Sequence, residues 1–146
     1  MKEITCKLRF LTPCLGHIRH DDCDLFERDA TGMVIFRSSW WRSLLDYGAK
    51  ALGKHQKKVR DIRIHPRIDG EPQQYNRYFK PHKFKTHEAY MPKQTVGIKV
   101  MLPDGLPVED FRTLFQLGGH YKGISPYQGK DQNEYGLFDL LEITEG

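Results

Sequence analysis

The chain has 146 residues, of which 38% are hydrophobic and 29% are charged, and its net charge is +4. This length allows one domain with a core of its own, and no apolar run reaches the roughly 20 residues of a membrane helix. We therefore expect a single domain over residues 1–146, in the cytoplasm and without a membrane partner. The alternating N-terminus is unlike a signal or transit peptide. Three closely spaced cysteines favour reduced thiols over a disulfide framework.

Hydrophobic periodicity predicts the order strand–helix–strand–strand–helix–strand. The expected strands cover 3–10, 59–65, 94–102 and 135–143, the expected helices cover 38–53 and about 107–117, and residues 12–32 are expected to form a polar loop. Ser38 or Ser39 is the expected cap of the first helix, and Gly118 and Gly119 are expected to end the second. Two βαβ halves with right-handed crossovers predict an α+β, ferredoxin-like βαββαβ sandwich: a four-stranded antiparallel sheet with two helices on one face.

Positive charge is concentrated in the middle of the chain. The segment 54–99 holds 12 of the 23 Lys and Arg residues but only 4 of the 19 Asp and Glu residues. Clustered cations are typical of a surface that binds a polyanion such as nucleic acid, although a solvated basic face gives the same composition.

The uncovered face of the predicted sheet and a long insertion carry many of these cations. Lys7, Arg9 and Lys99 would point to the open face. Residues 66–91 interrupt the second and third strands and interleave basic with aromatic residues. Cations neutralise phosphates and aromatic rings stack on unpaired bases, so a basic-aromatic hairpin that grips a single strand is expected. The alternative is an irregular hairpin whose aromatic rings pack on the core.

Four potential zinc ligands follow the first strand at a spacing of three. They are Cys14, His17, His20 and Cys23. Zinc prefers such a tetrahedral set, but four ligands from one ten-residue loop would join no separate elements. We expect a polar loop with incidental thiols, no metal and no other cofactor.

Support for catalysis is limited to three histidines. His17, His20 or His120 could act as a general base, since an imidazole titrates near neutral pH. A metal-independent endoribonuclease is therefore an alternative, whereas no acidic pair suggests a two-metal nuclease.

The run LGGHYKGISPYQG, 117–129, combines four glycines with basic and aromatic residues. It lacks the Walker pattern, and unlike a dinucleotide-binding loop it follows a helix and precedes a strand. Its glycines would let the backbone approach a ligand, with His120, Tyr121 and Lys122 as contacts. The alternative is a helix end followed by turns.

Three segments in this order resemble the RAMP superfamily of CRISPR-associated RNA-binding proteins. They are FLTPCLGHI (10–18), MVIFRSSWWRSLLDYGAKAL (33–52) and FQLGGHYKGISPYQGKDQNEYGLFDLLEI (115–143). The resemblance implies ferredoxin-like domains that grip single-stranded RNA or DNA without sequence preference, in a repeating CRISPR-like or viral nucleoprotein complex. The chain departs from the family in its shortness and in lacking a Pro-Gly before Ser38.

The leading hypothesis is a non-enzymatic single-strand nucleic-acid-binding protein that can also contact further copies or other subunits. A protein–protein module that caps or mimics a subunit of such a complex is the alternative. The expected binding residues are Lys7, Arg9, Arg37, Arg42, Arg77, Tyr78, Phe79, Lys80, Lys83, Lys85, Lys99, His120, Tyr121 and Lys122.

Overall fold

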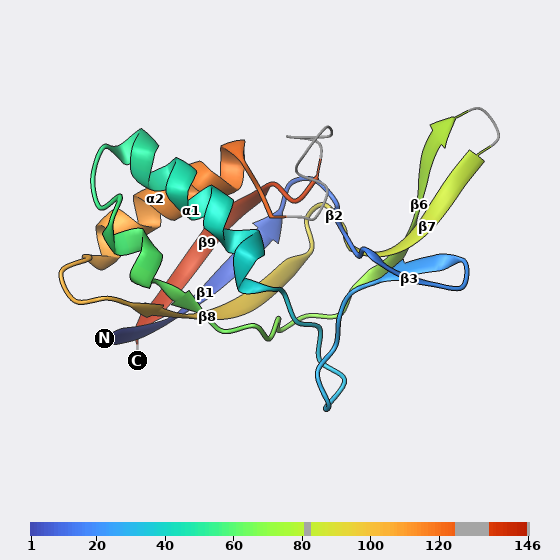
Figure 1. Cartoon of the computed structure of the whole chain (residues 1–146), viewed down its shortest axis with the longest axis horizontal. Helices are drawn as coiled ribbons and strands as arrows, with labels where there is room; N and C mark the ends of the chain where they lie inside the picture. Colours follow the sequence, from blue (N-terminus) through green and yellow to red (C-terminus); the bar gives the residue numbers. More distant parts are fainter. Residues whose placement is uncertain (81–82, 125–134, 146) are drawn as a thin grey trace.

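The computed structural model describes residues 1–80, 83–124 and 135–145, which form an α+β structure (Figure 1). Its first sheet has the strand order β5-β8-β1-β9, and all neighbouring strands are antiparallel. These strands are β1 (Lys2–Phe10), β5 (Arg63–Ile64), β8 (Thr95–Leu102) and β9 (Phe138–Glu145). Helices α1 (Ser38–Leu52) and α2 (Val108–Tyr121) lie side by side over one face of this sheet.

The core lies between the helices and this sheet. Alternate residues of β1, namely Ile4, Cys6, Leu8 and Phe10, are fully buried, as the period of two predicts. In register, Ile4 pairs with Val100 and Cys6 with Ile98, so β8 adds its own alternate residues to the same layer. No helix among the described residues is long and apolar enough to cross a membrane.

Glycines allow α1 and α2 to pack at backbone distance. A Cβ atom on Gly48 would lie 1.9 Å from the Leu114 carbonyl oxygen, and one on Gly118 would lie 2.3 Å from the Leu44 carbonyl oxygen. Gly119 faces the ring of Phe138 at similarly short range. The prediction that Gly118 and Gly119 end the second helix is wrong, because they are packing residues inside α2.

A second sheet replaces the expected polar loop over 12–32. It has the order β2-β7-β4-β3, with β6 paired to β7. Its strands are β2 (Cys14–Leu15), β3 (Ile18–His20), β4 (Cys23–Leu25), β6 (Gln73–Lys80) and β7 (Lys83–Tyr90). The loop prediction is wrong because the backbone of β2 and β4 pairs with an edge of β7, whereas strands of two or three residues carry no readable period. The β6–β7 hairpin extends away from the helices (Figure 1).

Two local predictions also fail. The expected strand over 59–65 begins as a 3₁₀ turn, η1 (Lys58–Asp61), and only β5 is extended. Val59 and Ile62 are both buried, and their spacing of three suits such a turn. The residue that caps α1 is Arg37, with extended backbone and no side-chain capping bond, so Ser38 and Ser39 are helical residues and not the cap.

Candidate functional site

The face of the first sheet that the helices leave uncovered carries an elongated hollow, called the trough below. It consists of two adjoining cavities of about 450 and 320 Å³, which share Thr5, Asp69 and Gly97. Other lining residues are Glu3, Lys7, Met33, His65, Arg67, Thr95, Lys99, Glu142 and Thr144. The trough therefore crosses from β9 over β1 and β8 to the segment 65–69.

Strand register explains which residues meet in the trough. Thr5 stands opposite Lys99, and Lys7 stands opposite Gly97 on one side and Glu142 on the other. Paired residues of an antiparallel ladder point to the same face, so Lys7 and Lys99 both point away from the helices. Gly97 has no side chain and forms the floor between them. A Cβ atom at this position would lie 3.4 Å from the Asp69 side chain, so the Asp69 carboxylate borders the floor.

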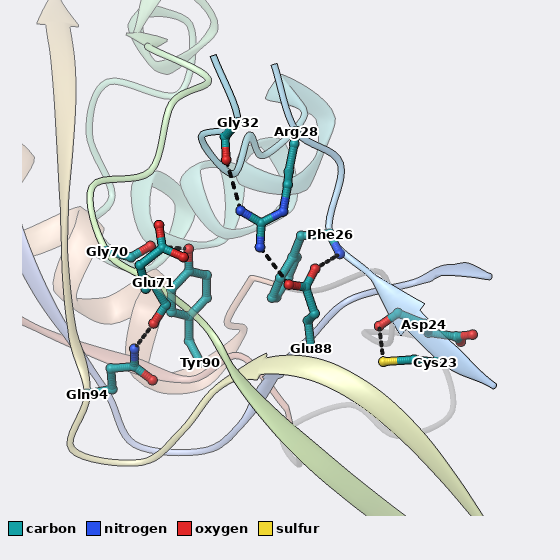
Figure 2. A network of polar contacts seen from close by, with 10 residues as sticks. All are labelled: Cys23, Asp24, Phe26, Arg28, Gly32, Gly70, Glu71, Glu88, Tyr90 and Gln94. Carbon is teal, nitrogen blue, oxygen red and sulfur yellow. Dashed lines mark hydrogen bonds and ion pairs between the residues drawn. The ribbon is translucent and has the colours of Figure 1, made fainter. Parts of the chain in front are cut away.

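The segment 65–70 forms the outer wall and is held by polar contacts from both sheets. The backbones of Asp69 and Gly97 exchange hydrogen bonds of 2.8 and 2.9 Å. The Tyr90 hydroxyl donates to the Gly70 carbonyl oxygen at 2.7 Å, and the Gln94 amide donates to the carbonyl of Glu71 (Figure 2). The end of the wall is thus held at three successive residues, Asp69, Gly70 and Glu71.

A second part of the same network ties the segment before α1 to β7. The Glu88 carboxylate accepts from the Phe26 backbone N–H at 2.9 Å and from Arg28 at 2.5 Å, and Arg28 also donates to the Gly32 carbonyl oxygen at 2.9 Å (Figure 2). Glu88 belongs to the strand that leads towards β8. Met33, which follows Gly32 and lines one end of the trough, donates its backbone N–H to the Asp29 carboxylate at 3.1 Å.

Cations and carboxylates alternate along the trough. Lys7 and Lys99 are exposed, and neither forms an ion pair with another described residue. Arg67 is paired with Asp29 at 2.7 Å, and its backbone N–H donates to His65 Nδ1 at 3.2 Å. The carboxylates of Glu3, Asp69 and Glu142 stand among the cations. The lining thus has three Lys or Arg side chains and three carboxylates, and Lys7 and Lys99 are the two of these cations without an ion pair to a described residue.

Several other expected binding residues make contacts inside the protein. Arg9 pairs with Asp139 at 3.2 Å, Arg37 with Glu27 at 3.1 Å, and Lys85 with Asp24 at 3.0 Å. Arg42 donates to the Val59 carbonyl oxygen at 3.0 Å and so joins α1 to η1. These residues do not line the trough.

The expected hairpin residues lie on β6 and β7, away from the trough. Tyr78 is 72% exposed. Arg77 Nε donates to Nε2 of the fully buried His87 at 3.3 Å, so this ring nitrogen is the acceptor. The ring proton is then on Nδ1, which donates to the Gly16 carbonyl oxygen at 2.8 Å. Burial lowers the pKa of His87. The side chains of Phe79, Lys80 and Lys83 lie outside the described part of the structure.

The glycine-rich run does not form a separate loop over its first residues. His120 and Tyr121 belong to the last turn of α2, Lys122 follows it, and residues 125–129 lie outside the described residues. His120 Nε2 contacts the Asp139 carboxylate, whose pKa is lowered by that hydrogen bond. Tyr121 is 58% exposed and packs against Tyr47.

The four Cys and His residues of the possible zinc set are distributed over β2, β3, β4 and their connections. Cys14 is fully buried near the Ile124 carbonyl oxygen, and burial raises the pKa of its thiol. The His17 ring meets Trp40 edge-on at 5.0 Å, whereas His20 is exposed and Cys23 is half-buried. Among residues 1–80, 83–124 and 135–145, no three His, Cys, Asp or Glu side chains are grouped to hold a metal ion.

Of the trough residues, only Lys7 and Lys99 were among the expected binding residues, and His65, Arg67 and Gly97 are three of those that the sequence did not identify. A signal was present for Gly97, because an isolated glycine inside a strand pattern often marks a place where something approaches the backbone closely. His65 and Arg67 continue the alternation of Arg63 beyond the short β5 and could have been placed on the same face.

A comparison with protein-family models found no matching family, and a comparison with curated proteins found no match either.

Proposed function

We propose that this chain binds single-stranded nucleic acid along the trough, without sequence preference and without catalysing a reaction. The observation that carries the proposal is the arrangement of Lys7 and Lys99 around the glycine floor at Gly97, on a sheet face that no helix of the described residues covers. The two cavities are of the size that holds small ligands, and the missing side chain of Gly97 leaves room beside the Asp69 side chain for a sugar-phosphate backbone.

We also infer that β1, α1, β5, β8, α2 and β9 form a ferredoxin-like βαββαβ unit that carries the second sheet as insertions. The strand order β5-β8-β1-β9, with antiparallel neighbours and both helices over one face, supports this inference. A relationship to the RAMP superfamily stays a proposal that rests on the order of three sequence segments.

Fluorescence anisotropy with a labelled oligothymidine of about 20 nucleotides tests the binding proposal. Lys7→Glu/Lys99→Glu should weaken binding by about tenfold or more at low salt, because two cations that face phosphates become anions. Arg112→Glu, a charge reversal on α2 over the opposite face, changes the net charge by −2, half the change in the double variant, and should bind as the wild type does. A loss of binding in this control, about half as large on a logarithmic scale, would show that only net charge matters.

The dependence of the binding constant on salt concentration is a second test of the binding proposal. For single strands the logarithm of the binding constant falls with the logarithm of salt with a slope of about −0.7 per phosphate contact. Two or three contacts in the trough predict a slope of about −1.4 to −2.1. No detectable binding of RNA or DNA at low salt would refute the proposed function.

A metal-independent endoribonuclease is a second candidate because one histidine is oriented as a base. Asp139 accepts from His120 Nε2, from Gln116 at 2.9 Å and from Arg9 at 3.2 Å. With Nε2–H donating to Asp139, His120 Nδ1 is free of a proton and can accept one from a ribose hydroxyl. This candidate predicts RNA cleavage in EDTA that His120→Ala abolishes and Asp139→Asn strongly slows. RNA that stays intact over long incubation would refute it.

A further inference from the structure

Four cations at every third residue lead away from one end of the trough. They are Lys54, Lys57, Arg60 and Arg63, called the basic row below. All four are exposed, and none forms an ion pair within the part of the chain that the structure describes. Many other cations, among them Arg9, Arg37 and Lys85, are neutralised by a carboxylate.

The local backbone aligns the two middle cations of the row. The Arg60 backbone N–H donates to the Lys57 carbonyl oxygen at 3.3 Å, and a 3₁₀ turn brings residues three apart onto one side. Val59 and Ile62 point inward and are buried, so the intervening positions hold the turn against the core. Lys57 and Arg60 are therefore presented on the same outer side of the turn, with Lys54 before it and Arg63 after it on β5.

The segment is also anchored at its start. His55 Nε2 contacts Asp110 at 2.8 Å, and Lys58 Nζ donates to the Asp104 carbonyl oxygen at 2.8 Å. Residues Gly53–Lys58 line a hollow of about 470 Å³ beside the row. A held backbone with unpaired cations and an adjoining hollow can receive a phosphate chain without first having to become ordered.

The row joins the trough at Arg63. Arg63 pairs with Met101 across β8, and Met101 pairs with Glu3 of β1, which lines the trough. Paired residues share a face, so Arg63 lies on the uncovered face at the Glu3 end. Strands are about 4.8 Å apart, so the path from β9 to the segment 65–69 measures about 15 Å and can seat only a few nucleotides.

We propose that the basic row continues the trough around the β5 edge of the sheet, and that it binds the sugar-phosphate backbone of a polynucleotide too long for the trough alone. This inference rests on the proposed function. The row offers cations without aromatic rings, so it should contact phosphates and add no base preference.

Oligothymidines of two lengths separate the row from the trough. Lys57→Glu/Arg60→Glu leaves Lys58, His55 and the trough in place. It should lower the affinity for a strand of about 20 nucleotides about tenfold and make its salt slope shallower by about 1.4. Binding of a strand of about 3 nucleotides, which the trough alone can seat, should change less than about twofold. The conservative exchange Lys57→Arg/Arg60→Lys should keep the affinity for both lengths. Lys7→Glu/Lys99→Glu should weaken both.

The possible failures are distinguishable. Equal losses for both lengths in Lys57→Glu/Arg60→Glu would overturn the inference, since the effect would then be general electrostatics. An unchanged affinity for the longer strand, with the trough variant still weakened, would overturn the row and keep the trough. Loss of binding to phosphatidylserine vesicles in the row variant, with nucleic-acid affinity unchanged, would assign the row to a membrane surface. No binding of either strand by the wild type would refute both proposals.

Discussion

The contact between the two helices makes a prediction about stability in which two effects have opposite signs. Replacing Gly118 by Ala should stabilise α2 by about 1 kcal/mol through helix propensity alone. However, the new Cβ would lie 2.3 Å from the Leu44 carbonyl oxygen, more than 1 Å closer than ordinary van der Waals contact allows. The obstacle is backbone, so no side chain can turn aside, and the helices must separate.

Overpacking of this kind costs about 3 kcal/mol, at the upper end of the usual range, because the obstacle is a backbone carbonyl group. The net effect of Gly118→Ala is therefore a loss of about 2 kcal/mol, or about 4–8 °C in Tm for a chain of this size. Urea unfolding followed by circular dichroism measures it. The difference between Asp46→Ala and Asp46→Gly at an exposed position in the middle of α1 gives the propensity contribution directly. A Gly118→Ala protein as stable as the wild type, or more stable, would refute the close helix contact.

Three other predictions address the trough and the titrating groups. Gly97→Leu should reduce nucleic-acid affinity about as strongly as the loss of both trough lysines, because the leucine side chain fills the hollow without a change of charge. Unchanged affinity in the anisotropy assay would contradict binding over Gly97. The pKa of His87 is lowered by burial, so the unfolded chain takes up the proton at a higher pH than the folded protein does. The free energy of unfolding should therefore fall as the pH drops below about 6.5. In urea unfolding, the difference in this free energy between pH 7 and pH 5 should be smaller for His87→Gln than for the wild type. The Thr31 hydroxyl and neighbouring donors lower the pKa of Asp29 to about 2. The contribution of this carboxylate to stability is therefore present above about pH 4 and should be lost as the pH falls towards 2. Urea unfolding of Asp29→Asn should not show this loss.

Long periodic segments were predictable because one period governed each of them. The buried alternation of β1 and the helical spacing of Trp41, Leu44, Leu45 and Gly48 in α1 can be read without knowledge of a partner. The resulting α+β class and the positions of β8 and α2 followed from the same signals. Lys7 and Lys99 were placed on the uncovered face by this alternation alone.

Features that depend on a partner segment were not predictable. β2 and β4 are strands only because β7 offers them an edge, and nothing local distinguishes their two or three residues from a loop. Gly118 and Gly119 looked like a helix end because the nearby carbonyl oxygen of Leu44 and the ring of Phe138 come from distant parts of the chain. The ion pairs that engage Arg37 and Lys85 likewise join residues far apart in sequence or on different strands.

The most direct test of the central claim is a backbone amide NMR titration of the ¹⁵N-labelled protein with a short oligothymidine. Binding in the trough predicts that the amide shifts of Thr5, Gly97 and Lys99 change together and saturate, whereas the amides on the outer side of α2 stay unchanged. The same shifts should be lost in Lys7→Glu/Lys99→Glu. Changes confined to α2, or no changes at low salt and high oligonucleotide concentration, would contradict the claim that the uncovered sheet face binds a single strand.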